Sequence, residues 1–452
     1  MTKESKKIIF IPASDIFLNI YIKLFKLIQK KYQKSVIFIL TYKSDYILPK
    51  CANVINISTN KEYEKAIKLS FLKKLFVKSL FIQRLYFFIK NKTLFGYYVY
   101  KQKLNFQKKY KVIEDLLNDF EIKRIIVSSD RMLINGYGPC IINYSRKNKT
   151  ELVFLQAAAI AFEPSIINIR RSKYYEYTYD FAPHLKAKYP KQYKNFKGQS
   201  YGYYKPEVLI ALSELNMLVE NPWIEGSSKL MKMIIHNNIQ KRLLTKNGID
   251  EKSIRVTGRI EHDHLKKNIS ENKKIKSEDY QKILIALPQV AEHGMVDMED
   301  SLKLNKTFIK ALLKLDNLNI TISLHPKMNL DFYKYHFRGL DIKLIQSNIE
   351  LEIAIQHLFL SFFSSTIDLA ILSNVAAANI DFWSLGKDYK FMKSIYKTPV
   401  FDDIDLICDF IKKELKTNFP FSKLREEQSE IKKDLSPFDG RAINEIMRYT
   451  LS

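Results

Sequence analysis

The sequence has little of what builds linkers, disulfide frameworks or membrane spans. Its 452 residues include 12 glycines and 13 prolines, so long flexible linkers are not expected. Cys51, Cys140 and Cys408 are far apart and odd in number, which argues against a zinc knuckle or a disulfide framework and for a reducing compartment. No apolar run reaches the roughly 18 residues of a transmembrane helix, and the run before Pro12 is too short for a signal peptide. We therefore expect a cytoplasmic protein.

Several widespread motifs are missing as well. No G-x-G-x-x-G follows a predicted strand, and neither a G-x-x-x-x-G-K-[ST] phosphate loop nor a G-x-S-x-G elbow occurs. His262 and His264 are two residues apart, a spacing that points side chains in different directions on a helix. We therefore expect no metal ion and no cofactor. Signatures of nucleic-acid-binding modules are also missing, which argues against nucleic acid as the partner.

Acidic residues are scarce relative to basic ones. The 74 lysines and arginines exceed the 48 aspartates and glutamates, so the formal net charge is +26. Such an excess suggests an anionic partner, which is a nucleic acid, a membrane surface or a phosphorylated substrate. An AT-rich genome, which favours lysine, isoleucine and asparagine codons, explains the excess equally well.

The segment 65–111 contains no acidic residue, while lysines and arginines recur throughout it with phenylalanines and tyrosines between them. We predict that it is an insert in the first half of the chain. Such a pattern is typical of segments that lie on an anionic membrane surface or bind single-stranded nucleic acid. It is equally compatible with a packed insert whose lysines form a solvated face.

Short apolar runs rich in β-branched residues recur along the chain and alternate with helix-length segments. In the first half they lie at 6–14, 35–44, 53–58, 122–131, 150–158, 207–214, 232–238 and 253–259. After the charged segment 266–281 they lie at 282–288, 319–326, 341–347, 358–366 and 376–383. The alternation predicts an α/β fold with two Rossmann-like, doubly wound domains that face a cleft. We expect the domains at 1–265 and 276–452.

In a doubly wound sheet, ligands bind outside the carboxyl ends of the strands. The side chains that follow three predicted strands of the second domain are suited to a nucleotide phosphate: they are Glu292 and His293, then His325, Pro326 and Lys327, then Ser364, Ser365 and Thr366. Each group has an ordinary structural explanation too, namely a surface loop, a histidine bonded to backbone, and a helix N-cap. Their succession on one sheet predicts a site for a nucleotide.

In the first half, Asp130 follows the strand at 122–127 and is the best-placed candidate for a general base. Helix capping or a structural pair with an arginine is the alternative. Glu163 and His184 are weaker candidates. After the strand at 253–256, Gly258 is expected to permit a tight turn, and Arg259 is expected to reach a phosphate.

These motifs resemble bacterial glycosyltransferases of the GT-B fold, which has two Rossmann-like domains. The similarity is to the group with a His-Pro motif and a later Ser-Ser/Thr motif, which includes sialyltransferases, polysialyltransferases and related capsule transferases. The matching segments are 323–327 and 362–370. Residues 248–265 are similar to the end of the first domain in GT-B enzymes and nucleotide-sugar 2-epimerases. The tail 437–451 looks like the closing helix of such folds, which is expected to pack back on the first domain.

The resemblance implies that His325 and the hydroxyls of Ser364, Ser365 and Thr366 contact phosphate. It implies a metal-independent glycosyltransferase with an N-terminal acceptor domain and a C-terminal nucleotide-sugar domain. The donor is expected to be a CMP-sugar, with UDP- and CDP-sugars as further options. The acceptor is expected to be a glycan or glycolipid of the capsule or lipooligosaccharide, reached peripherally at the inner face of the cell membrane. Asp130, Glu292 and His293 are the catalytic candidates.

Two alternatives stay open at this point. One is a nucleotide-sugar 2-epimerase or a polyol-phosphate transferase of the same fold. The other is a non-catalytic, basic protein that binds a membrane or RNA on a scaffold derived from an enzyme.

Overall fold

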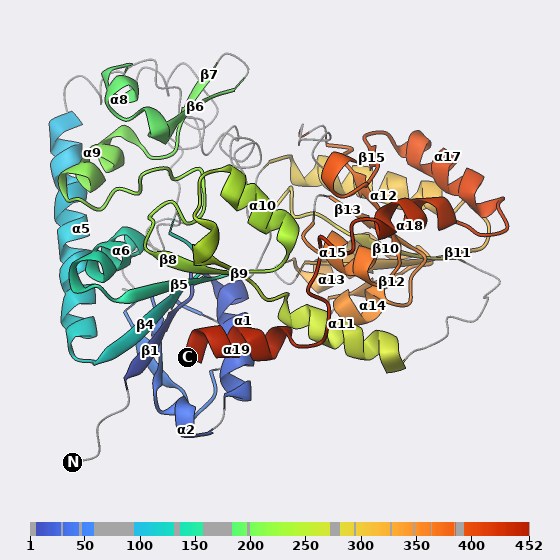
Figure 1. Ribbon diagram of the computed structural model, residues 1–452. Helices are drawn as coiled ribbons and strands as arrows, with labels where there is room; N and C mark the ends of the chain where they lie inside the picture. Colours follow the sequence, from blue (N-terminus) through green and yellow to red (C-terminus); the bar gives the residue numbers. More distant parts are fainter. Residues whose placement is uncertain are drawn as a thin grey trace. The chain divides into compact units, whose positions relative to one another are not determined.

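The computed structural model describes residues 6–28, 30–44, 48–57, 95–130, 136–156, 183–196, 199–271, 281–292, 295–325, 328–346, 349–362, 364–383, 385 and 393–451. The chain divides into two compact units (Figure 1). Unit 1 comprises Met1–Ile235, Lys241–Arg255 and Glu445–Ser452, and unit 2 comprises His236–Gln240 and Val256–Asn444. The chain enters unit 2 first at His236–Gln240 and again from Val256 onward. The expected domain limits at 1–265 and 276–452 stay a prediction.

Unit 1 contains a seven-stranded sheet with the strand order β3-β2-β1-β4-β5-β8-β9. The strands are β1 (Lys7–Ile11), β2 (Val36–Leu40), β3 (Asn53–Asn56), β4 (Ile122–Val127), β5 (Glu151–Leu155), β8 (Met231–Ile235) and β9 (Ile254–Val256). Adjacent strands from β3 through β8 are parallel. The order reverses between β1 and β4, as in Rossmann folds. All five residues of β2 are buried, as expected of a strand covered on both faces.

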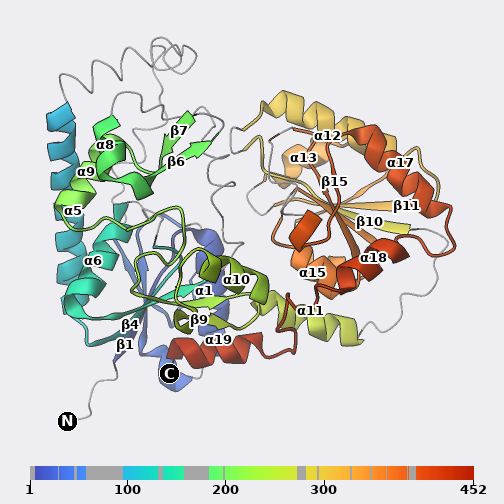
Figure 2. The same cartoon turned by 45° about the horizontal axis from the view of Figure 1, so that its top comes forward.

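The helices of unit 1 cover both faces of this sheet (Figure 2). They are α1 (Asp15–Leu27), α2 (Lys30–Gln33), α5 (Phe95–Asn118), α6 (Gly138–Asn148), α8 (Pro183–Lys188) and α9 (Pro206–Glu214), together with most of α10 (Asn238–Lys246) and α19 (Ala442–Leu451). Helix α5 packs against α6 and α9. Short helices η3 (Pro190–Gln192) and η4 (Glu251–Ser253) and an antiparallel hairpin of β6 (Tyr193–Phe196) and β7 (Gln199–Gly202) complete the unit.

One predicted strand, 207–214, is wrong, because these residues form helix α9. A short apolar run cannot by itself be assigned to a buried strand or to a buried helix. The signal that decides is Pro206, which occupies the first turn of the helix, where its missing N–H costs nothing. Leu209 and Leu212 are buried on the side of α9 that the fold covers.

The last residues of the chain belong to unit 1. Lys123 Nζ donates to the carbonyl of Leu451 at 2.7 Å, and Arg124 Nη1 donates to the carbonyl of Tyr449 at 2.5 Å. Both donors come from β4. Basic side chains at the C-terminus of a helix bond its unpaired carbonyls and complement its dipole, so these two bonds attach the last turn of α19 to β4.

Unit 2 contains a six-stranded sheet with the order β12-β11-β10-β13-β14-β15, in which every adjacent pair is parallel. The strands are β10 (Gln281–Ala286), β11 (Leu318–Ser323), β12 (Lys343–Ile345), β13 (Leu358–Ser361), β14 (Ala376–Ile380) and β15 (Val400–Phe401). The helices are α11 (Ile260–Glu271), α12 (Met298–Leu312), α13 (Leu330–His336), α14 (Ile349–Ile353), α15 (Ile367–Leu372), α17 (Ile404–Leu415) and α18 (Ser422–Ser429).

One face of this sheet is covered by α12, α13 and α17, whose apolar residues form a continuous core with the strands. Phe308, Ile309 and Ile407 are completely buried in it. In the part of the chain that the structure describes, no helix is both long and apolar enough to cross a membrane.

Candidate functional site

The candidate site lies at the carboxyl edge of the sheet of unit 2. Strands β11, β10 and β13 are neighbours and run parallel, so the loops that follow them lie side by side. The loop after β10 is the middle one of the three. Because the strand order reverses between β10 and β13, this edge contains the topological switch point at which doubly wound folds bind ligands.

The predicted residues on this edge differ in how far they are exposed. Glu292, after β10, is exposed, whereas His325, Ser364, Ser365 and Thr366 are half-buried. His293, Pro326 and Lys327 lie outside the described residues. The carboxylate of Glu292 accepts a hydrogen bond from the hydroxyl of Tyr333 at 2.7 Å. Burial, followed by this bond, raises the pKa of Tyr333 well above its ordinary value.

The turn after β11 is held by its own backbone and by one glutamine. Met328 N donates to the carbonyl of His325 at 2.9 Å, and His325 N lies 3.3 Å from the sulfur of Met328, a buried side chain. Gln346, which follows β12, donates its side-chain amide to the carbonyls of His325 at 3.1 Å and Met328 at 2.5 Å. The end of one strand therefore supports the turn at the end of its neighbour.

The turn after β13 is shaped by its hydroxyls. Ser364 Oγ accepts from Thr366 N at 3.2 Å and lies 2.7 Å from Thr366 Oγ1. Thr366 occupies the N-cap position of α15, but its side chain makes no capping bond to the helix. The hydroxyls expected to cap α15 instead form a local turn of the kind that serine and threonine favour.

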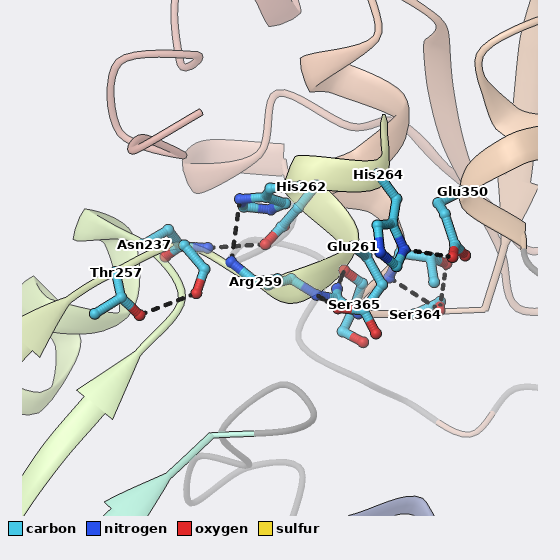
Figure 3. Close-up of polar contacts among 12 residues, drawn as sticks. Asn237, Thr257, Arg259, Glu261, His262, His264, Glu350, Ser364 and Ser365 are labelled. Carbon is cyan, nitrogen blue, oxygen red and sulfur yellow. Dashed lines mark hydrogen bonds and ion pairs between the residues drawn. The ribbon is translucent and has the colours of Figure 1, made fainter. Parts of the chain in front are cut away.

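The turn after β9 is tied to the turn after β13 (Figure 3). Arg259 Nη1 donates to the carbonyl of Ser365 at 2.9 Å, and Arg259 Nε lies 3.4 Å from a carboxylate oxygen of Glu261. Arg259 is buried, with 6% of its surface exposed. Arg259, which was expected to reach a phosphate, therefore bonds the backbone of the Ser365 turn. Its role toward phosphate stays a prediction.

Gly258, next to Arg259, occupies a crowded position. Its φ of +82° lies in the left-handed region, and a Cβ added there would stand 3.0 Å from the carbonyl oxygen of Pro437 and 3.2 Å from Nδ1 of His262. Only glycine fits both the conformation and the space. The positive φ fits the expectation that glycine is needed here, and the tight turn itself stays a prediction.

A buried carboxylate lies beneath the Ser365 turn. Asp368, in the first turn of α15, is 2% exposed and accepts from Asn237 Nδ2 at 2.8 Å. Burial raises its pKa to about 6, while Arg259, Asn237 and Tyr396 oppose that shift. The turn is thus followed by a buried carboxyl group with polar neighbours, an arrangement whose parts depend on one another.

His262 and His264 lie in different environments (Figure 3), as expected from their spacing. His262 is completely buried, with Nδ1 3.2 Å from the carbonyl oxygen of Pro437 and its ring edge-on to Phe438. Burial, followed by the charge of Arg259, lowers its pKa to about 4, so it is neutral. His264 is about half exposed, and its Nδ1 is 3.6 Å from a carboxylate oxygen of Glu350.

The predicted base Asp130 lies at the switch point of the other sheet, in unit 1. Its two carboxylate oxygens accept from the backbone amides of Gly226 at 3.0 Å and Ser228 at 2.9 Å. Glu225, also buried, accepts from Ser129 Oγ at 2.5 Å and from Asp130 N at 3.1 Å. Asp130 thus closes a loop onto the strand end, and its role as a base stays a prediction. His184 is exposed on α8, and Glu163 lies outside the described residues.

The sequence did not predict the residues that bond to the turns of the site or to one another next to it. These are Asn237, Gln346, Asp368 and Tyr396. Asp368 carried one signal, because a carboxylate inside the apolar run after Thr366 is costly to bury without a partner. Nothing local indicates which residue that partner is.

No protein-family model and no curated protein sequence matches the chain. Among solved structures, the calicheamicin glycosyltransferase CalG4 superimposes with a TM-score of 0.55 at 11% identity, over 99% of this chain and 98% of that one. At this identity the match establishes a shared fold. The predicted class, α/β with two Rossmann-like domains of the GT-B type, is therefore confirmed.

Two further structures are similar at a lower level. The UDP-GlcNAc 2-epimerase of Neisseria meningitidis, solved with UDP-GlcNAc bound, scores 0.48 at 12% identity over 99% of both chains. The wall teichoic acid polymerase TagF scores 0.47 at 12% identity, over 99% of this chain and 88% of that one.

Proposed function

We propose that the protein is a glycosyltransferase that binds a nucleotide sugar at the carboxyl edge of the sheet of unit 2. The observation that carries the proposal is the adjacency of three loops, after β11, β10 and β13, at a topological switch point. They bring an imidazole, a carboxylate and three hydroxyl groups to one edge. In a GT-B fold this edge is suited to the phosphates of a nucleotide.

The proposed chemistry stabilises the departing nucleotide with groups of the protein. The hydroxyls of Ser364 to Thr366 and the imidazole of His325 would donate to phosphate oxygens as negative charge develops there. Hydrogen-bond donors of this kind supply the stabilisation that a metal ion supplies in other enzymes. Arg259 and Gln346, which bond the backbone of the two turns, would keep these donors in place.

The donor and acceptor are proposed from the resemblance of the His-Pro and Ser-Ser/Thr motifs. A CMP-sugar is the first choice of donor, followed by UDP- and CDP-sugars. The acceptor is a glycan or glycolipid of the cell surface, of the capsule or lipooligosaccharide kind, glycosylated at the inner face of the membrane. Among the described catalytic candidates we favour Glu292, because it is exposed at the switch point whereas both oxygens of Asp130 accept backbone amides.

A two-stage experiment tests the proposal. Thermal shifts with CMP, CDP, UMP and UDP would identify the nucleotide, and titration calorimetry would compare His325→Ala and Ser364→Ala with the parent chain. We expect a loss of affinity on the order of tenfold or more for each, as for a lost hydrogen bond to a charged phosphate. His336→Ala, at the end of α13, is the matched control and should bind normally.

The second stage measures turnover of the matching nucleotide sugar with and without a glycan acceptor. Transfer that requires the acceptor supports the proposal, whereas conversion of the donor in its absence would identify an epimerase. Nucleotide binding without turnover of any donor would favour a non-catalytic protein. Unchanged affinity and transfer in His325→Ala would overturn the site assignment.

A further inference from the structure

Helix α5 exposes large apolar side chains that its packing in unit 1 does not use. Tyr97 and Tyr100 are 60% and 59% exposed, and Leu104 and Val112 are 37% and 42% exposed. Spacings of three, four and eight residues place them along one side of a helix. Single exposed apolar residues are ordinary, but a row of them on one helix is typical of a surface that binds a partner.

The opposite side of α5 is already packed. Val99, Phe106 and Ile113 are buried, and the helix contacts α6 and α9. Figures 1 and 2 both show α5 at the rim of unit 1 with α6 and α9 on one side of it. The fold of unit 1 therefore does not require the exposed row.

Helix α5 is also rich in lysine, and two of its lysines lie within the exposed row. From Phe95 to Ile113 the helix has five lysines and no acidic residue. Lys103 pairs with Glu214 of α9, and Lys111 pairs with Asp115. Lys101 and Lys108 are exposed and form no ion pair with any residue in the described part of the chain. They lie within the row of exposed apolar residues.

We propose that this surface, the α5 face made of Tyr97, Tyr100, Lys101, Leu104 and Lys108, docks on an anionic lipid bilayer. Tyrosine rings favour the boundary between headgroups and acyl chains, and lysines extend their apolar stems there while their ammonium groups meet lipid phosphates. The apolar residues of the α5 face thus match the acyl chains of an anionic bilayer, and its lysines match the lipid phosphates.

A second copy of this chain fits the α5 face poorly. In a two-fold dimer the same face meets itself, so the lysines of one copy would be brought close to the lysines of the other. A bilayer with acidic headgroups presents the complementary charge instead. The inference rests on the membrane location in the proposed function, and it names the surface that would bring unit 1 to a membrane-bound acceptor.

The test is co-sedimentation of the full chain with vesicles of phosphatidylcholine plus phosphatidylglycerol and with vesicles of phosphatidylcholine only. One variant, Tyr97→Ser, Tyr100→Ser and Leu104→Ser, removes the apolar contacts, and another, Lys101→Gln and Lys108→Gln, removes the charge. We expect each to lower the partition coefficient on the anionic vesicles on the order of tenfold. Added salt should weaken binding of the parent chain and affect the lysine variant less.

Helix α17 provides a matched control. Leu406 is 55% exposed there, and Lys412 and Lys413 are exposed as well. Leu406→Ser with Lys412→Gln and Lys413→Gln changes the same residue types in unit 2 and should leave vesicle binding unchanged. Thermal unfolding should match the parent chain in every variant, because all the substituted side chains are exposed.

Three results would overturn the proposal. They are parental binding by both α5 variants, equal binding to the two kinds of vesicle, and binding to polyuridylate with none to vesicles, which would point to nucleic acid. Nucleotide affinity and transfer to a water-soluble acceptor provide a separate readout. The α5 variants should retain both, so failure of the docking surface and failure of the proposed function are distinguished.

Discussion

The two sheets use their carboxyl edges in different ways. In unit 1, the residues after β4 are buried and bonded to the protein itself, with Asp130 held by the amides of Gly226 and Ser228. In unit 2, the residues after β10, β11 and β13 remain half-buried or exposed, and the bonds beneath them are made by Arg259 and Gln346. We call the strand end at Asp130, to which a loop is bonded, the closed edge of unit 1. We call the carboxyl edge of the sheet of unit 2, whose turns are bonded by Arg259 and Gln346, the open edge.

The difference shows that two carboxylates that follow central strands can be bonded in different ways. Asp130 and Glu292 both follow central strands, yet the carboxylate of Asp130 stabilises a loop whereas that of Glu292 is exposed. Each oxygen of Asp130 already accepts a backbone amide, so fewer of its lone pairs are left for a substrate.

The largest effect is expected from opening the closed edge. Asp130→Ala leaves the amides of Gly226 and Ser228 without an acceptor, and we expect the free energy of unfolding to fall by roughly 2 to 4 kcal/mol. Asp130→Asn should lose less, because one oxygen remains. Urea denaturation measures both, with exposed Asp119→Ala as the control. Full stability combined with lost transfer would instead make Asp130 the general base.

The support of the open edge should depend on pH through Asp368. Its pKa is raised to about 6 in the folded state, so its stabilising contribution is present below its ordinary pKa and is lost as pH rises through 6. Asp368→Asn removes this loss. The difference in free energy of unfolding, Asp368→Asn minus parent chain, should therefore rise by roughly 2 to 3 kcal/mol from about pH 4 to about pH 6. A constant difference across this range would contradict the assignment.

His262 should act in the opposite direction over the same range. Because its pKa is lowered to about 4, its contribution is present above its ordinary pKa and is lost as pH falls through 4. His262→Asn should be less stable overall, since a packed ring is removed. Its deficit should shrink by roughly 2 to 3 kcal/mol as pH falls from about 6.5 to about 4. Urea denaturation across this range measures it, and a deficit that stays constant would be the contrary result.

A smaller effect separates backbone strain from crowding beneath the open edge. Gly258 and Gly248 both have positive φ, but an added Cβ meets Pro437 at Gly258 and open space at Gly248. Gly248→Ala should cost about 1 kcal/mol of unfolding free energy, and Gly258→Ala about 1 to 2 kcal/mol more. Equal losses in thermal denaturation would mean that the crowding is relieved by movement.

The smallest effect on stability is expected at the open edge itself. Ser364→Ala removes a hydroxyl from a half-buried turn and should change the unfolding free energy by less than about 1 kcal/mol. Its effect should appear in nucleotide affinity. Ser270→Ala, exposed on α11, should change neither quantity. A Ser364→Ala variant that loses stability but keeps its affinity would make this edge resemble the closed one.

Much of the fold follows from local pattern. Strands such as β2 and β10 are apolar runs of the right length, and their alternation with helical segments predicts parallel sheets. The run 207–214 failed because pattern does not separate a short buried helix from a strand. The edge strand β15 has two residues, too few for any period to be detected.

The sequence predicted where the candidate residues lie along the chain, but it did not predict which residues bond to them. His325 and Ser364 were found because each follows a strand, a rule that needs only the order of elements. Gln346 and Asp368 were not found, because their partners lie on other elements of unit 2. Hydrogen bonds between elements depend on the register of the sheet, which no local signal encodes.

The sequence by itself determined the class of fold, the need for glycine at position 258 and the chemical types of the residues at each strand end. These depend on period, on backbone sterics and on neighbours along the chain. The tertiary structure decided the bonding of those residues, and with it the closure of the Asp130 edge, the burial of Arg259 and the outward row on α5. The physical reason is that burial and hydrogen-bond partners arise from contacts between elements distant in sequence, which exist only once the sheets and helices have packed.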